Sequence, residues 1–171
     1  VTTYWRKYRP VLRSEGAPSN STPIEVIFGL AGLAIEAAET PDWPTTLSKE
    51  EVIIACRYAV YELNGFPPWF PQLFEAYPGI VGEFLLSEMQ QEVISEEPDT
   101  DSHYLLSDIT WSGQWAWEQL APDLQKLLQE HEVTNAFNLG KLLTIVQGST
   151  SVTDYDLALL AEQKAKSAEI M

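Results

Sequence analysis

Apolar residues recur every three or four positions along most of this chain, which is the spacing of one face of an α-helix. The clearest helix follows Ser48, which forms a capping box with Glu51. It is expected to stop at Asn64-Gly65, a pair typical of a left-handed helix end. Its apolar residues on one face are Val52, Ala55, Cys56, Ala59, Val60 and Leu63.

Similar spacing predicts further helices, each bounded by proline, glycine or a capping residue. Their expected ranges are 24–39, 69–76, 80–94, a helix beginning at Pro122, 135–146 capped by Thr134, and a last helix from Thr153 or Ser151 to about 168. Shorter candidates lie at 103–109 and 112–120. In the first of these helices, Thr22 is the expected cap. That helix carries at helical spacing the residues Ile24, Ile27, Phe28, Ala31, Ile35 and Ala38.

No segment shows a convincing strand pattern, so we expect an all-α fold built from antiparallel helix pairs. Such pairs can stack into a HEAT-like α-solenoid or close into a compact helical bundle. Both arrangements stay open, because no strict sequence period is present. Residues 1–22 are expected to form an aromatic and basic N-terminal arm, and residues 23–171 a single all-helical domain. The chain starts with Val1, so we expect a fragment of a larger protein.

The formal net charge is −15, and it is unevenly spread. No lysine or arginine occurs between Arg57 and Lys126, whereas twelve carboxylates fall in that gap. A field of one sign repels phosphates, so we expect a basic protein partner and no nucleic acid. The N-terminal arm carries four of the ten basic residues, and we expect it to dock on the acidic body of its own chain or to support self-association.

Cys56 is the single cysteine, and its apolar neighbours indicate a buried, unreactive thiol. A lone cysteine fits a reducing compartment, so a cytoplasmic protein is expected. No stretch of about 18 uninterrupted apolar residues occurs, so no membrane association is expected.

Motifs for catalysis, nucleotide binding and zinc binding are missing, so we expect no enzyme and no cofactor or metal. His103 lies near Asp99, Asp101 and Asp108, a group that could hold a cation or form an acid–base pair. A solvated acidic loop is the favoured interpretation. His131 falls in the last turn of a helix, where a cation stabilises the helix dipole.

Three tryptophans, Trp111, Trp115 and Trp117, fall within seven residues. At i,i+4 the first two are predicted to share a helix face, so Trp117 must point elsewhere. At least one of the three should be partly exposed or line a groove. Packing between helices is the favoured role, and an aromatic anchor for a partner is the functional alternative.

The segments Leu63-Asn-Gly-Phe-Pro-Pro-Trp-Phe and Tyr77-Pro-Gly-Ile-Val-Gly-Glu-Phe-Leu-Leu86 resemble paired helices in the HEAT-like helical regions of large bacterial multidomain proteins. The resemblance covers residues 48–95. It implies a scaffold or sensor segment, and it carries over no catalytic residue.

These observations predict a non-catalytic protein–protein interaction or scaffold domain. The expected partner-binding residues combine aromatic area with carboxylates that attract a basic partner: Trp111, Trp115, Trp117, Glu88, Glu92, Glu96 and Asp99. Two alternatives stay open. One is an acidic inhibitor that imitates nucleic acid, and the other is a hydrolase that uses the acidic loop around His103.

Overall fold

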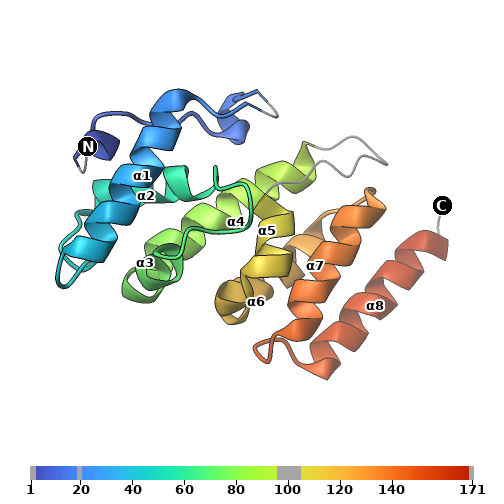
Figure 1. Ribbon diagram of the computed structural model, residues 1–171. Coiled ribbons are helices and arrows are strands. Elements are labelled where there is room, and N and C mark those ends of the chain that lie inside the picture. The colour runs from blue at the N-terminus through green and yellow to red at the C-terminus, as the bar shows by residue number, and fades with distance from the viewer. Residues whose placement is uncertain (1–2, 19–20, 96–104, 170–171) are drawn as a thin grey trace. The chain divides into compact units, whose positions relative to one another are not determined.

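The computed structural model describes residues 3–18, 21–95 and 105–169, with side chains described as far as Ala165. Within these ranges the chain forms α-helices and short 3₁₀ helices and no strand, which confirms the all-α class (Figure 1). The α-helices are α1 (Ile24–Glu39), α2 (Lys49–Ala59), α3 (Phe70–Ala76), α4 (Pro78–Ile94), α5 (Leu105–Ser112), α6 (Trp117–Glu130), α7 (Ala136–Gly148) and α8 (Asp154–Glu169). The 3₁₀ helices are η1 (Tyr4–Arg6), η2 (Arg13–Glu15) and η3 (Gln114–Ala116).

The chain divides into two compact units, unit 1 from Val1 to Leu85 and unit 2 from Leu86 to Met171. The division falls inside α4, and the N-terminal arm belongs to unit 1. A single domain over residues 23–171 therefore stays a prediction, and each unit is described by itself.

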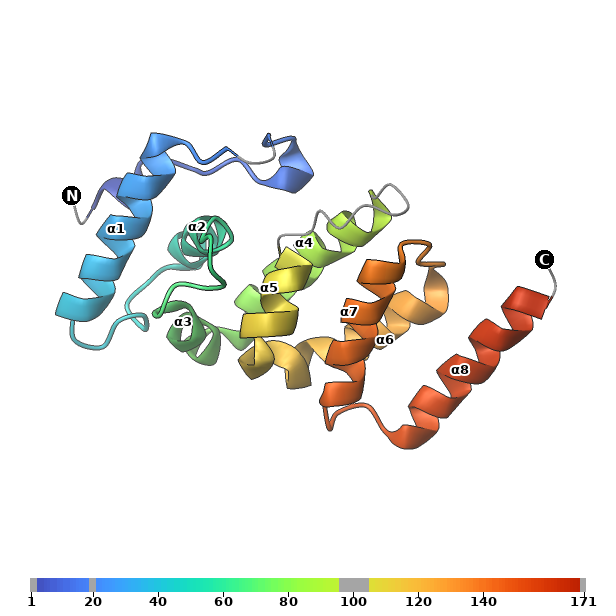
Figure 2. The same cartoon turned by 45° about the vertical axis from the view of Figure 1, so that its right-hand side comes forward.

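The core of unit 1 forms where α1, α2 and η1 meet (Figure 2). Trp5 of η1 is completely buried, as are Val26 and Leu33 of α1. Gly29 lets Tyr58 of α2 approach α1 closely, because a Cβ atom at residue 29 would lie 2.0 Å from the Tyr58 ring. The glycine in this helix is thus required for packing, although it lowers intrinsic helix stability.

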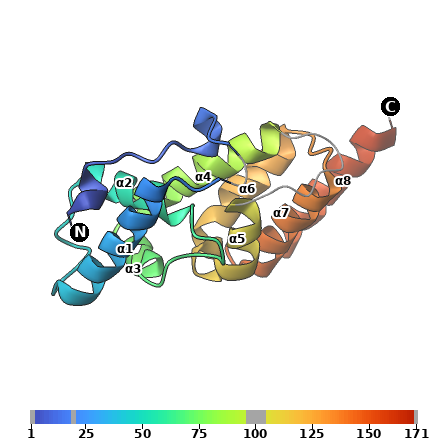
Figure 3. The same cartoon turned by 45° about the horizontal axis from the view of Figure 1, so that its top comes forward.

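The N-terminal arm docks on its own unit and lies beside α1 and α2 (Figure 3). Arg57 of α2 is buried, and its Nε donates to the carbonyl oxygen of Pro10 at 2.7 Å. The hydroxyl of Tyr58 donates to the carbonyl oxygen of Tyr8 at 3.0 Å. Main-chain groups of the arm therefore satisfy two polar side chains that α2 directs toward the core.

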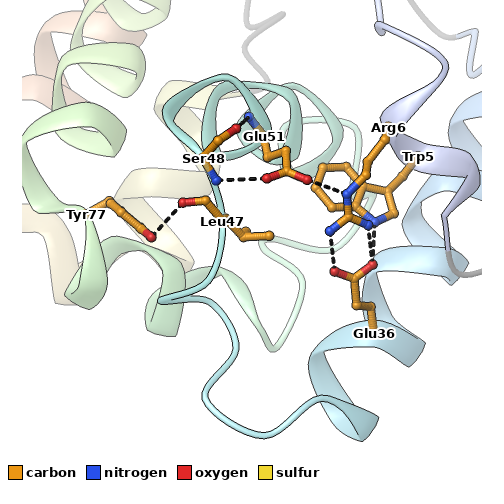
Figure 4. A network of polar contacts seen from close by, with 7 residues as sticks. All are labelled: Trp5, Arg6, Glu36, Leu47, Ser48, Glu51 and Tyr77. Carbon is orange, nitrogen blue, oxygen red and sulfur yellow. Dashed lines mark hydrogen bonds and ion pairs between the residues drawn. The ribbon is translucent and has the colours of Figure 1, made fainter.

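A four-residue network ties η1 to both helices (Figure 4). The guanidinium of Arg6 donates to both carboxylate oxygens of Glu36, at 2.6 and 2.7 Å, and to Glu51 through Nε. The indole nitrogen of Trp5 donates to Glu36 at 2.9 Å. Glu51 also accepts from the backbone nitrogen of Ser48 at 2.8 Å, which confirms the predicted capping box.

Two details of the helices in unit 1 differ from the sequence-based expectation. The residue that precedes α1 is Pro23 instead of Thr22, and its side chain makes no capping hydrogen bond. The second helix ends at Ala59, before the expected Asn64, because the backbone N–H groups of Tyr61 and Glu62 bond to carbonyl groups three residues earlier. Such i→i−3 bonds tighten and terminate a helix.

Unit 2 is built around α6, which packs against α7 and α8, whereas α5 packs against α7. The buried residues of α6 and α7 recur at helical spacing: Leu120, Leu124, Leu127, Leu128, Leu142, Ile145 and Val146. The prediction that a helix starts at Pro122 was wrong, because α6 begins at Trp117 and contains the proline. Pro122 faces solvent. Because proline has no backbone N–H group, it removes the helical hydrogen bond to one carbonyl group only, that of Glu118 in the first turn.

The last two helices begin close to their expected positions. The cap of α7 is Asn135 instead of Thr134, and its side chain accepts from the backbone nitrogen of Asn138 at 3.1 Å. Before α8, Thr153 and Asp156 bond to each other's backbone nitrogen atoms at 3.2 Å. Across residues 3–18, 21–95 and 105–169, no helix has the length and apolar character needed to cross a membrane.

Candidate functional site

A groove of about 440 Å³ lies on unit 2 between α5 and α7, and we call it the α5–α7 groove. One wall comes from α5 and the other from α7. The lining residues are Ser107, Thr110 and Trp111 on α5, and Ala136, Phe137, Gly140, Lys141 and Thr144 on α7.

The walls of the α5–α7 groove present two aromatic rings to solvent. Trp111 is 72% exposed and Phe137 is 50% exposed. Gly140 leaves space between them, since a Cβ atom at this position would have no neighbour within 4 Å. A concave surface with exposed aromatic walls can bury an apolar side chain of a ligand.

The polar groups of the groove are few and mostly engaged within their own helices. The hydroxyl of Thr110 donates to the carbonyl oxygen of Leu106 at 2.6 Å, and that of Thr144 to Gly140 at 2.8 Å. Thr110 is buried, whereas Thr144 is exposed, so the Thr144 oxygen atom can still accept a hydrogen bond from a ligand. Lys141, which is half-buried, brings an ammonium group to the α7 wall. This set of groups suits binding and contains no acid–base pair.

Of the three clustered tryptophans, Trp111 is the one that is largely exposed. The prediction that Trp111 and Trp115 share a helix face was wrong, because α5 ends at Ser112 and Trp115 lies in η3. The indole nitrogen of Trp115 donates to the carbonyl oxygen of Ser112 at 3.1 Å. That of Trp117 donates to Ile109 at 2.8 Å. These two half-buried rings hold the α5–α6 connection in place.

Trp117 also packs against α7 through a glycine. A Cβ atom at Gly148 would lie 2.3 Å from the Trp117 ring. A second glycine, Gly113, shapes the turn after Trp111, since a Cβ atom there would lie 2.7 Å from the Cα atom of Ile109. The exposed position of Trp111 therefore depends on a tight turn that follows it directly.

Of the four predicted carboxylates, the two that the structure describes, Glu88 and Glu92, do not line the groove. Glu92 on α4 accepts from the backbone nitrogen of Leu106 at 3.0 Å and thereby caps the first turn of α5. Glu88 is half-buried on the same helix. Glu96 and Asp99 lie outside the described residues, so their part in a partner site stays a prediction.

A carboxylate that sequence analysis did not select, Glu118, has a defined role in unit 2. It accepts from the backbone nitrogen of Thr150 at 2.8 Å and from the hydroxyl of Ser149 at 3.1 Å. These hydrogen bonds, that from Thr150 foremost, lower the pKa of Glu118. Its charge holds the loop between α7 and α8 in place.

The structure describes some of the other candidate groups and leaves others out. Cys56 is completely buried, as predicted, and burial raises the pKa of its thiol. His131 is exposed and directly follows Glu130, the last residue of α6. His103, Asp99 and Asp101 lie outside the described residues. In the part of the chain that the structure describes, no three His, Cys, Asp or Glu side chains are grouped so that they could hold a metal ion.

The sequence analysis missed the α7 wall of the groove. The core side of α7 carries Asn138, Leu142 and Ile145, so Phe137 and Lys141 lie together on a neighbouring face. An aromatic residue four positions before a lysine on a solvated helix face was the available signal.

No protein-family model matches this chain, and no similarity to a curated protein or to a solved structure is found.

Proposed function

We propose that this protein is a non-catalytic protein–protein interaction or scaffold domain that binds its partner in the α5–α7 groove. The observation that supports the proposal is the position of Trp111, which is 72% exposed on the wall of a groove. Contact of an apolar indole group with water is unfavourable, so its burial by a partner would stabilise the complex. Tryptophan is also enriched among the residues that dominate binding energy. Phe137 on the opposite wall would enclose the same partner side chain.

The charge of unit 2 supports a basic partner. Residues 86–171 contain fifteen acidic and four basic residues, a net charge of −11. Such a field attracts basic proteins over distance and raises their association rate. Within the groove, Lys141 would donate a hydrogen bond to a backbone carbonyl group of the bound segment. The proposal includes a HEAT-like scaffold, because helices in both units pack in pairs.

The contacts that several carboxylates make within their own unit do not favour the alternative of an inhibitor that imitates nucleic acid. Glu36 and Glu51 bind Arg6, Glu15 binds Arg57, and Glu92 and Glu118 accept backbone hydrogen bonds. A carboxylate that is fixed inside its own unit is a poor imitation of an accessible phosphate.

The experiment is photo-crosslinking followed by a binding measurement. A photoreactive phenylalanine analogue at residue 137 should trap a partner in cell lysate, whereas the same analogue at residue 155 should not. Tyr155 on α8 is a matched control, because it is 71% exposed and lies outside the groove. The trapped protein is then purified, and its affinity is measured by calorimetry.

Trp111→Ala should weaken this affinity by at least about tenfold, whereas Tyr155→Ala should leave it within about twofold. Circular dichroism checks that both variants are folded. Equal trapping at residues 137 and 155, or an unchanged affinity of Trp111→Ala, would refute the groove as the binding site.

A further inference from the structure

The side of α1 that faces away from α2 is apolar along its whole length, and we call it the α1 outer face. Its residues are Ile24, Ile27, Phe28, Ala31, Ala34, Ile35 and Ala38. The four large ones are 61%, 56%, 52% and 38% exposed in chain order. The apolar stripe found in the sequence is thus the exposed side of the helix, while the buried side carries Val26, Gly29, Gly32 and Leu33.

This arrangement makes α1 apolar on two opposite sides. An amphipathic helix of a globular protein normally places one apolar stripe on the core and polar residues on the other side. A helix of 16 residues is about 24 Å long, and the stripe covers four turns of it. The large residues and the alanines of this face together form ridges and grooves into which a second helix can pack. The α1 outer face therefore has the length and relief of a helix-docking surface.

Charge on one border of the α1 outer face indicates what would bind there. Helical spacing places Glu25, Glu36 and Glu39 on the same side of the stripe. Glu36 forms an ion pair with Arg6. Among the described residues, the carboxylates of Glu25 and Glu39 have no polar partner. No lysine or arginine occurs in the sequence between Arg13 and Lys49. The border thus carries the carboxylates of Glu25 and Glu39 near its two ends, with the Arg6–Glu36 ion pair between them.

We propose that the α1 outer face docks an amphipathic helix of another protein whose apolar stripe is bordered by lysine or arginine. The apolar residues of both helices would be buried, and the basic border would lie against Glu25 and Glu39. This inference does not depend on the α5–α7 groove, because it concerns a different unit.

Charge argues against two other occupants. In a second copy of this chain, antiparallel pairing of α1 helices would bring Glu25 close to Glu39 of the other copy. An anionic membrane surface would be repelled by the same acidic border.

The test uses two labelled synthetic peptides of 18 residues composed of leucine and lysine. One peptide has leucine at helical spacing, and the other has the same composition in scrambled order. Fluorescence anisotropy should show at least about tenfold tighter binding of the patterned peptide by the unmodified protein, since only this peptide can bury a continuous stripe. The scrambled peptide controls for attraction to the net charge.

Variants then locate the binding site. Ile27→Gln with Phe28→Gln should reduce the preference for the patterned peptide to less than about threefold, because both side chains leave the stripe. Glutamine favours helix, and the replaced side chains are exposed, so the fold should be retained. Leu63→Gln removes an apolar side chain that is 82% exposed elsewhere in unit 1, and it should leave the preference unchanged.

A Glu25→Gln, Glu39→Gln variant tests the acidic border. It should bind the patterned lysine peptide more weakly, by about threefold to tenfold, and a leucine–glutamate peptide more tightly.

The proposal is overturned if the two lysine peptides bind equally, or if Leu63→Gln lowers the preference as much as the α1 variant does. It is also overturned if sedimentation shows a dimer that the Ile27→Gln, Phe28→Gln variant dissociates, or if the protein binds lipid vesicles through the same residues. The Trp111→Ala variant should bind the patterned peptide normally, which separates this result from that of the groove.

Discussion

The two units use their acidic residues in different ways. In unit 1, Glu15, Glu36 and Glu51 bind arginine side chains, and the unit has a net charge of −4. In unit 2, Glu92 and Glu118 accept hydrogen bonds from backbone N–H groups, which carry no full charge, and the net charge is −11. Carboxylates hold both units together, but those of unit 1 do so as partners of arginine side chains. The negative charge of the protein therefore lies mainly in unit 2.

Both units nevertheless solve the packing of large aromatic residues in the same way. Tyr58 lies against Gly29 in unit 1, and Trp117 lies against Gly148 in unit 2. In each case the helix has a glycine at the point of contact, so an aromatic ring from another segment can touch its backbone. The units thus share a packing device and differ in electrostatics, and variants can test each half of this comparison.

Filling the space of these glycines should have the largest effect. Gly29→Ala and Gly148→Ala place a Cβ atom 2.0 and 2.3 Å from rigid rings, so each should lower the free energy of unfolding by about 3 kcal/mol. Urea unfolding monitored by circular dichroism measures this change. Gly79→Ala and Gly140→Ala are matched controls in helices, with no neighbour within 4 Å, and should be neutral or stabilising by up to about 1 kcal/mol. Equal effects at all four glycines would contradict the shared device.

Removing the buried arginine of unit 1 should come next. Arg57→Met leaves the Pro10 carbonyl group without its charged donor and removes one of the two arginines that bind Glu15, which should cost about 2 kcal/mol in urea unfolding. Lys126→Met is the control in unit 2, because Lys126 and Glu130 form an exposed pair at 3.8 Å that should be worth less than about 0.5 kcal/mol. A similar loss in both variants would show that buried and exposed pairs do not differ here.

Acid should weaken unit 1 through its ion pairs. Burial by itself raises the pKa of Glu15, but Arg57, the Leu12 N–H and Arg9 together lower it from 4.5 to about 2. The hydrogen bond from Arg6 likewise lowers the pKa of Glu51. Burial by itself raises the pKa of Glu36, but the hydrogen bonds from Arg6 and Trp5 and the charge of Arg6 together lower it.

A carboxylate with a lowered folded-state pKa stabilises the fold above its unfolded-state value and loses this contribution as pH falls through the folded-state pKa. The melting temperature should therefore fall between about pH 5 and pH 2. Arg6→Gln should melt roughly 4 °C below the unmodified protein at pH 7, and the two curves should converge near pH 2. A constant difference over this range would mean that Arg6 does not act through these carboxylates.

The smallest effect should come from the carboxylate cap of unit 2. Glu92→Ala removes the acceptor of the Leu106 N–H group and should lower stability by about 1 kcal/mol. Gln91→Ala, an exposed neighbour on the same helix, should change it by less than about 0.5 kcal/mol. Hydrogen exchange at the first turn of α5 would show whether the loss is local, and unchanged exchange there would contradict a capping role.

Local signals predicted much of the helical framework. The capping box of Ser48 and Glu51, the Thr153 cap and the spacing of buried residues in α4 depend on atoms a few positions apart, so they can be inferred from sequence. Pro122 misled the prediction because its exclusion from a helix interior is a tendency that buried neighbours such as Leu120 and Ala121 can override. The turn at Gly113 likewise separated Trp111 from Trp115, which spacing alone had placed on one face.

By itself, the sequence determined the all-α class, most helix positions and the negative charge, because periodicity, capping and composition are local or additive properties. The tertiary structure alone decided which side of α1 is buried, since both of its sides are apolar and only the close approach of Tyr58 to Gly29 distinguishes them. It also decided that Trp111 is the exposed member of its cluster and that Phe137 stands opposite it across a groove. These features depend on contacts between segments far apart in the chain, and no local pattern encodes them.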